Sequence, residues 1–266
     1  MDAATPVLLR DDADGVTTLT LNRPAARNGL SLALLGRLRE ELAGLAADDA
    51  VRCVIVAANG PAFCAGHDLK EIAAHFADAD GGRGVFAETM EACARVMTAI
   101  PALPQPVIAA VEGVATAAGC QLVAACDLAV AGQAARFCTP GVEIGLFCST
   151  PAVALSRAVP RKAAMEMLLT GEMIGAAEAH RLGLVNRVVS AGEALSAARA
   201  LAGGIAARSA VAIRLGKRGF VRQYGAPLEE AYRMASETMV ENLLAQDAAE
   251  GIGAFLGKRP PVWSHR

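Results

Sequence analysis

Residues 107–121 read VIAAVEGVATAAGCQ, a β-prone run followed by very small side chains. Val107 to Val111 is predicted to form a buried strand, and Ala117 to Ala125 a helix that can pack closely against its neighbours. The small side chains also let a ligand approach the backbone where the helix begins, and the first N–H groups of a helix lack internal partners. The stretch therefore predicts a strand, a ligand-accessible turn and a helix.

A second loop of this kind reads FCAGHDLK at residues 63–70. It follows a strand predicted at 51–57 and enters a helix with Asp68 near its start. Each loop alone is also typical of an ordinary strand-to-helix turn. Together they can direct two backbone N–H groups at one developing oxyanion, an arrangement worth several kcal/mol in acyl chemistry.

Strands and helices alternate through the first half of the chain. Asp14-Gly15 separates runs 7–10 and 16–21 and predicts a hairpin. Ser31 is the predicted N-cap of a helix whose leucines recur at intervals of three and four. From about residue 151 the pattern is helical, apart from a strand predicted at 184–189. This order favours an α/β sheet followed by a helical region.

Composition narrows the function. The chain has 266 residues, 54% of them hydrophobic, which suits one large core. A formal charge of −2 makes nucleic acid an unlikely kind of partner. Seven cysteines without a C-x-x-C pair favour reduced thiols and a cytoplasmic location. The N-terminal segment carries acidic residues such as Asp2 and is not expected to be a targeting signal. A membrane span is not expected either.

Four motifs, in this order, resemble the crotonase (enoyl-CoA hydratase/isomerase) family: NRPAARN at 22–28, FCAGHDLK at 63–70, VEGVATAAGCQ at 111–121 and GLVN at 183–186. The resemblance implies a crotonase-like spiral of ββα units over residues 1–200 and a C-terminal helical trimerisation region over 201–266. It implies a homotrimer or a hexamer built as a dimer of trimers. It also implies an acyl-CoA or enoyl-CoA thioester substrate, with no metal and no resident cofactor, because the substrate carries coenzyme A.

The resemblance also assigns site residues. The two oxyanion donors are the backbone N–H groups of His67 and Ala118, and neither role depends on the side chain. Coenzyme A is expected to contact the backbone of the same chain, a lysine near its phosphates, and an aromatic residue and a lysine that reach it from a neighbouring subunit. These coenzyme A-binding residues are Ala26, Arg27, Ala65, Lys70, Phe255 and Lys258.

The sequence departs from the family at the acid and base. The resemblance places the two glutamates of the hydratases at Gln121 and Gly141, and neither residue exchanges a proton at neutral pH. Glu143 is the best candidate base, because in an extended chain it would face the same way as Gly141; it also fits a surface carboxylate. The His67 imidazole is an alternative, since it titrates near neutrality. Cys148 is expected to be a packing group.

Two function classes stay open. The first is an enoyl-CoA hydratase or isomerase that stabilises a thioester enolate. The second is a coenzyme A-thioester binding protein without catalysis, which the residues at 121 and 141 favour. A nicotinamide-dependent dehydrogenase is disfavoured, because no predicted strand is followed by G-x-G-x-x-G and an acidic residue about 20 positions later.

Overall fold

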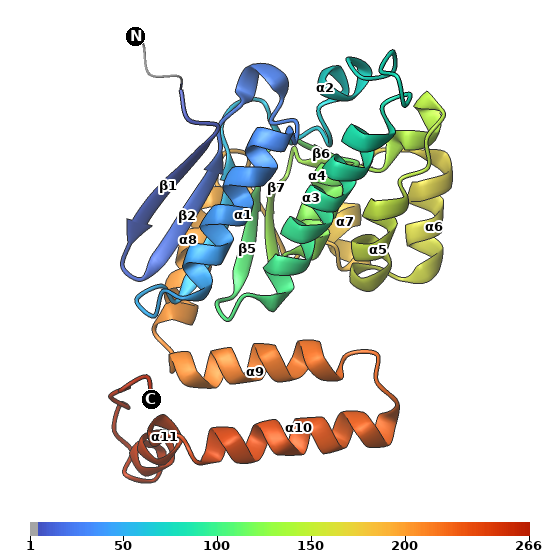
Figure 1. The fold of residues 1–266 in the computed structure, drawn as a ribbon. Coiled ribbons are helices and arrows are strands. Elements are labelled where there is room, and N and C mark those ends of the chain that lie inside the picture. The colour runs from blue at the N-terminus through green and yellow to red at the C-terminus, as the bar shows by residue number, and fades with distance from the viewer. Residues whose placement is uncertain (1–4) are drawn as a thin grey trace.

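Two sheets form the centre of the molecule in the computed structural model, which describes residues 5–266 (Figure 1). Residues 1–4, including Asp2 and the start of the predicted spiral region, lie outside this description. The larger sheet has the order β1-β2-β3-β5-β7-β10, in which only the β1–β2 pair is antiparallel. The smaller sheet has the order β4-β6-β8-β9, in which only β8–β9 is antiparallel.

The strands of both sheets are short. They are β1 (Leu8–Ala13), β2 (Val16–Leu21), β3 (Cys53–Ala58), β4 (Ala62–Cys64), β5 (Val107–Val111), β6 (Val114–Thr116), β7 (Leu128–Gly132), β8 (Arg136–Cys138), β9 (Ile174–Gly175) and β10 (Arg187–Val189).

The helices surround these sheets and form the C-terminal region. The α-helices are α1 (Leu32–Ala46), α2 (Leu69–Ala73), α3 (Arg83–Ala102), α4 (Ala118–Ala125), α5 (Ser149–Ala158), α6 (Arg161–Thr170), α7 (Ala176–Leu182), α8 (Ala194–Ala206), α9 (Ala210–Gln223), α10 (Leu228–Leu243) and α11 (Gln246–Leu256), and the two 3-10 helices are η1 (Pro24–Ala26) and η2 (Pro140–Ile144).

A repeated ββα step builds the core. One strand joins the larger sheet, the next joins the smaller sheet, and a helix follows: β3-β4-α2/α3, then β5-β6-α4, then β7-β8-η2/α5. Successive steps add parallel neighbours, so both sheets advance through the chain in the same direction. The predicted spiral of ββα units is present.

Local signals in the sequence explain several boundaries. Asp14 and Gly15 both have positive φ, as a tight hairpin turn requires, and join β1 to β2. Ser31 caps α1, because its side chain accepts a hydrogen bond from Leu34 N at 3.2 Å. The predicted strand at 184–189 is too long: only β10 is extended, while Leu184 and Val185 are buried in the turn that follows α7.

The larger sheet is covered on both faces. One face packs against α1, α3 and α4 in the main core. The other packs against α8, whose Ala198 and Ala202 are fully buried against Ile55 and Ile108. The predicted domain boundary at residue 200 falls inside α8, so the helices that lie beside the spiral begin with α9 (Figure 1).

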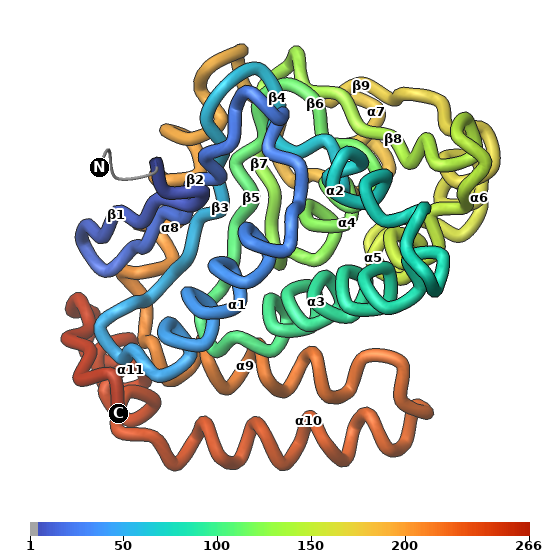
Figure 2. The backbone as a smooth tube through the Cα atoms, turned by 45° about the horizontal axis from the view of Figure 1, so that its top comes forward, coloured from blue at the N-terminus to red at the C-terminus, as the bar shows by residue number. Residues whose placement is uncertain are grey.

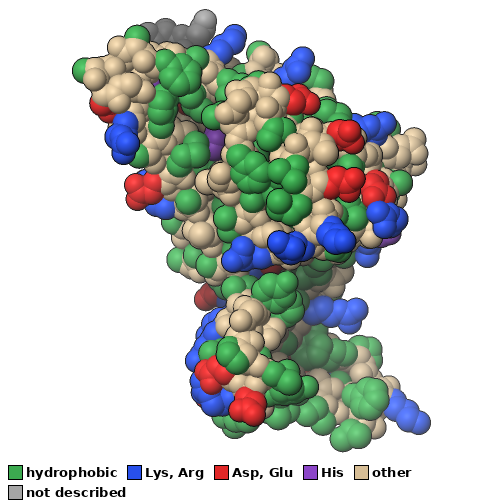
Figure 3. All heavy atoms as spheres, turned by 90° about the vertical axis from the view of Figure 1, so that its right-hand side faces the viewer, with side chains coloured by type: hydrophobic (Ala, Val, Ile, Leu, Met, Phe, Trp, Pro, Cys, Tyr) green, Lys and Arg blue, Asp and Glu red, His purple; other side chains and the backbone are tan. Residues whose placement is uncertain are grey.

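The C-terminal helices lie below the spiral, with α9 against it and α10 beneath α9 (Figures 1 and 2). Lys217 anchors α9: its Nζ donates to Asp127 Oδ2 at 2.5 Å and to the carbonyl oxygens of Ile100 and Gln105. Seen from the side, these helices form a lower lobe carrying many hydrophobic side chains (Figure 3). Within residues 5–266 there is no helix of the length and apolarity that a bilayer span needs.

Candidate active site

Strands β4, β6 and β8 end at the same edge of the smaller sheet, because they are adjacent and parallel. The carboxyl ends of parallel strands are where ligands bind in open α/β sheets. Residues 65–67 follow β4, residues 117–121 follow β6, and residues 139–143 follow β8. The fold therefore brings all the predicted catalytic positions, His67, Ala118, Gln121, Gly141 and Glu143, to one edge.

The His67 backbone N–H has no partner within residues 5–266. His67 pairs with Leu30 in a parallel bridge, and that bridge uses the groups on either side of it. Leu30 N donates to Gly66 O at 2.8 Å, and Asp68 N donates to Leu30 O at 3.3 Å. In such a parallel bridge one residue, here Leu30, makes both hydrogen bonds, and the N–H of the opposite residue points away from the partner. The His67 N–H is therefore available to a ligand.

The Ala118 N–H is also without an acceptor in the described part of the chain, because Ala118 is the first residue of α4. The preceding residue, Ala117, has φ 49° and ψ −119°, a conformation that normally requires glycine. The Ala117 N–H donates a hydrogen bond to Cys138 O at 2.9 Å. The contact to β8 and the unusual backbone together fix the direction of the Ala118 N–H.

Glycines let the two loops touch. Gly66 has φ +91°, and a Cβ built on it would lie 2.9 Å from Ala117 Cβ and 3.4 Å from Ala118 N. Gly119 is still tighter, since a Cβ there would lie 2.1 Å from the carbonyl oxygen of Cys64. Any side chain at either position would separate the β4 loop from the start of α4. These two glycines explain why the His67 and Ala118 amides are close neighbours.

Two buried polar atoms at this edge lack partners among residues 5–266: His67 Nε2 and Gln121 Oε1. The Gln121 side chain is only 4% exposed and makes no hydrogen bond there through either end of its amide. Burial lowers the pKa of His67, so its imidazole is neutral near pH 7. Unsatisfied buried groups are rare in proteins, so each of these atoms calls for a ligand group or a water as its partner.

A thiol and a backbone carbonyl crowd the space beside Gly141. A Cβ built on Gly141 would lie 2.9 Å from Cys148 Sγ and 2.9 Å from the carbonyl oxygen of Leu146. Cys148 is buried, as expected of a packing group. Burial raises the pKa of Cys148 and raises that of nearby Cys138 to about 11, so both remain protonated thiols.

The expectation that Glu143 faces the same way as Gly141 is wrong. Residues 140–144 form the 3-10 helix η2 rather than an extended strand, and side chains in a 3-10 helix align every three residues, not every two. Glu143 is solvent-exposed, and its Cγ lies beside Gly171 at the end of α6.

Asp68 has a structural role: its side chain caps α2 and forms an ion pair with Arg23 at 2.8 Å.

The predicted coenzyme A contacts divide into two groups. Arg27 O accepts from Ala65 N at 3.0 Å, so η1 and the β4 loop adjoin, with Ala26 and Arg27 exposed and Lys70 exposed on α2. Phe255 and Lys258 lie at the end of α11, far below this edge (Figure 1). The Phe255 side chain is 83% exposed. One chain does not bring these two residues to its own site.

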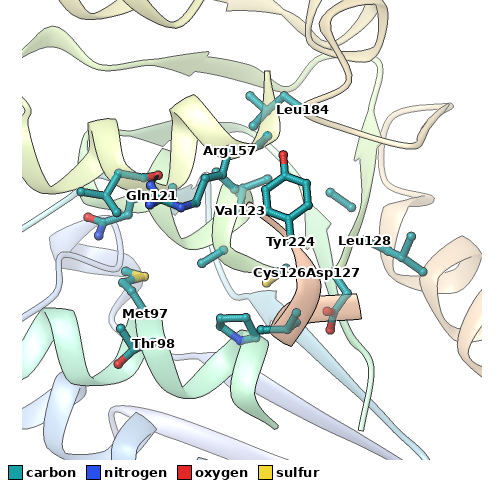
Figure 4. A pocket seen from close by; sticks show the side chains of 18 of the residues that line it. Met97, Thr98, Gln121, Val123, Cys126, Asp127, Leu128, Arg157, Leu184 and Tyr224 are labelled. Carbon is teal, nitrogen blue, oxygen red and sulfur yellow. Dashed lines mark hydrogen bonds between the residues drawn. The ribbon is translucent and has the colours of Figure 1, made fainter. Parts of the chain in front are cut away.

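A cavity of about 820 Å³ lies between α3, α4, α5 and the end of α9. Gln121 is at its boundary, one turn of α4 beyond Ala118, and most of the other lining side chains are apolar (Figure 4). Arg157 also lines it, a residue that the sequence interpretation missed. The available signal was the spacing of residues 150, 153, 154, 157 and 158, which lie on one face of a helix.

Comparisons with known proteins identify the family of this chain. The model of the family described as enoyl-CoA hydratase/isomerase matches residues 11–266. The mouse mitochondrial enoyl-CoA hydratase domain-containing protein 3 is 49% identical over 95% of this chain and 82% of the mouse protein. The crystal structure of its human counterpart is 47% identical, with a TM-score of 0.91 over 97% of this chain and all of that one.

A crystal structure of enoyl-CoA hydratase from Mycobacterium smegmatis is 52% identical and has a TM-score of 0.93 over 97% of this chain and 99% of that one. The fold thus defines an α/β protein with two mixed sheets and C-terminal helices. The chain belongs to the crotonase (enoyl-CoA hydratase/isomerase) family, and it has that family's fold of two mixed sheets and C-terminal helices.

Proposed function

We propose that this protein binds an acyl-CoA or enoyl-CoA thioester and stabilises the enolate oxygen with the backbone N–H groups of His67 and Ala118. The supporting observation is that neither amide has an acceptor within residues 5–266 and that the two loops carrying them meet at Gly66. Charge develops on the thioester oxygen only as the enolate forms, so fixed donors favour the transition state over the ground state. Loss of one such donor costs about 10²- to 10³-fold in kcat.

The rest of the thioester would lie along the exposed backbone of Ala26, Arg27 and Ala65. Lys70 is placed to meet the nucleotide phosphates, because a lysine ammonium suits phosphate as a compact charge. Phe255 and Lys258 would act on the coenzyme A of a neighbouring subunit, which explains their distance from their own site. This arrangement requires an oligomer, and the family resemblance favours a homotrimer or a hexamer of paired trimers.

The reaction would be that of an enoyl-CoA hydratase or isomerase. Gln121 and Gly141 supply no exchangeable proton at neutral pH, so hydration should be slow unless another group acts. Glu143 remains a candidate base, now as an exposed residue at the edge of the site. The second candidate function, thioester binding without catalysis, is favoured by Cys148, which fills the space that a side chain at 141 would need.

Incubation with crotonyl-CoA and longer enoyl-CoA thioesters, followed by loss of the conjugated thioester absorbance, tests these alternatives. Glu143→Gln is compared with Glu193→Gln, which removes an exposed carboxylate at the start of α8, away from this site. Turnover that falls more than about tenfold only in Glu143→Gln supports Glu143 as the base. Absence of turnover on every chain length, with thermal stabilisation by the thioesters intact, supports the binding protein. Absence of both overturns the proposal.

The cysteine pattern and the names of the relatives point to different cellular compartments. The cysteine pattern favours the cytoplasm, whereas the names of the mouse and human relatives include the word mitochondrial. We retain a cytoplasmic location as a prediction, and localisation of the tagged chain in its own cells tests it.

A further inference from the structure

We propose that the cavity between α3, α4, α5 and α9 selects acyl groups that carry a carboxylate at the end distant from the thioester, with Arg157 as the residue that recognises it. The inference rests on the proposed function, because it assigns this cavity to the acyl part of the same thioester. The cavity adjoins the candidate site, since Gln121 lies three residues, or about 4.5 Å of helix rise, beyond Ala118.

Arg157 is the first observation. Its Nη1 donates to Val153 O at 2.8 Å on the preceding turn of α5, and its side chain extends toward Gln121 across the cavity (Figure 4). Within residues 5–266, Asp and Glu oxygens all lie more than 4.0 Å from its guanidinium nitrogens. Arg157 is solvent-exposed as well as lining the cavity. Its guanidinium has donors left for a carboxylate bound there, which an arginine can hold through two parallel hydrogen bonds.

Gln121 is an independent second observation. It is 96% buried, its Oε1 is enclosed without a partner in the described part of the chain, and its amide makes no other hydrogen bond there. A buried amide in this state requires a ligand or water that supplies the missing bonds. Gln121 and Arg157 line the same cavity. A carboxylate held by Arg157 can accept from the side-chain N–H groups of Gln121, whereas Gln121 Oε1 is itself an acceptor and needs a donor such as water.

The side chains that line the cavity determine which kind of ligand can bring a carboxylate into it. Met97, Val123, Ala154 and Leu184 make the cavity largely apolar, so a small hydrated anion gains little there, whereas a hydrocarbon segment buries its surface. Asp127 is the acidic residue of the lining. Its Oδ2 accepts hydrogen bonds from Lys217 Nζ at 2.5 Å and from Val107 N at 2.7 Å, so its negative charge is already paired. Asp127 lies beyond the end of α4, six residues after Gln121.

Two matched ligand series test the proposal by calorimetric titration. One series is the mono-coenzyme A thioesters of dicarboxylic acids with four to eight carbons, and the other is the straight-chain acyl-CoA of each same length. We expect the wild-type protein to prefer the carboxylated ligand at one or more lengths. Arg157→Gln should weaken that ligand about tenfold or more and the methyl-ended ligand less than twofold.

Arg161→Gln is the matched control, because it removes an exposed arginine that does not line the cavity. It should leave both series unchanged, and thermal unfolding checks that Arg157→Gln folds. Equal weakening of both series by Arg157→Gln would place coenzyme A phosphate, not the acyl carboxylate, on Arg157 and overturn the inference. A wild-type preference for methyl ends at every length would also overturn it. Failure of both series to bind the wild type would instead overturn the proposed function.

Discussion

The thiol of Cys148 lies directly against the space that a side chain on Gly141 would enter, with Sγ 2.9 Å from the position of the missing Cβ. The carbonyl oxygen of Leu146, also 2.9 Å away, closes the same space from the backbone. The resemblance to hydratases places a catalytic glutamate at this position. In this chain the local backbone and the thiol have taken its volume, so a single substitution cannot restore that glutamate without movement of its surroundings.

Gly141→Ala should therefore destabilise the protein. Adding one methyl group to a closely packed site costs about 1–3 kcal/mol, and urea unfolding measures the change. Gly203→Ala is the control: Gly203 lies in α8 with no atom near its missing Cβ, and alanine there should stabilise by about 0.5–1 kcal/mol. A Gly141→Ala protein as stable as the wild type would show that the space is not filled as described.

The sequence predicted the elements whose signals are local. The Asp14-Gly15 turn, the Ser31 cap and the strand at Val107 to Val111 all appear as expected. The strands β4, β6 and β8 were not predicted, because each has three residues and too short a pattern to show a period. Their pairing is set by the spiral rather than by their own sequence.

The parts of the site formed by backbone groups could be predicted from the sequence. The parts that depend on contacts between distant side chains could not. Small residues and glycine identified the loops that contain His67 and Ala118. The contact of Cys148 with Gly141 depends on how η2 and the following turn fold back, which no residue pattern indicated. The predicted orientation of the Glu143 side chain was wrong for the same reason. The cavity arginine, Arg157, becomes visible only when α5 is placed beside α4.

His67 should make the stability depend on pH. Its folded pKa is lowered by burial from the ordinary value of 6.5, so its contribution is fully present above about pH 6.5 and is lost as the pH falls through the folded pKa. Urea unfolding of the wild type and of His67→Gln at pH 5 to 7.5 should give a shallower decline in the variant. Identical declines would show that this imidazole is not desolvated.

Asp247 should stabilise the C-terminal region. This buried carboxylate accepts hydrogen bonds from Ser209 Oγ at 2.6 Å, Ser264 N at 2.7 Å and His265 N at 3.0 Å. Asp247→Ala leaves these donors without an acceptor and should cost about 1–3 kcal/mol. Asp247→Asn keeps one acceptor oxygen and should cost less. Equal effects of the two substitutions in urea unfolding would contradict this account.

The lower lobe should hold the subunits together. Leu244 is 82% exposed at the end of α10, and Leu228, Tyr232 and Val240 are also exposed on that helix. Exposed apolar surfaces of this kind are typical of subunit interfaces. Sedimentation should show a trimer or hexamer for the wild type and smaller species for Leu244→Asp. A wild-type monomer that binds coenzyme A at full affinity would contradict the assembly.

The infrared carbonyl stretch of a bound, carbonyl-labelled enoyl-CoA tests the oxyanion donors most directly. Hydrogen bonds from the amides of His67 and Ala118 should polarise the thioester carbonyl and lower its frequency relative to free thioester. Gly66→Ala, which inserts a methyl group between the two loops, should abolish most of the shift. Gly81→Ala, also at positive φ but with no atom within 4 Å, should preserve it. A bound carbonyl that absorbs at the frequency of the free thioester in the wild type would contradict the account.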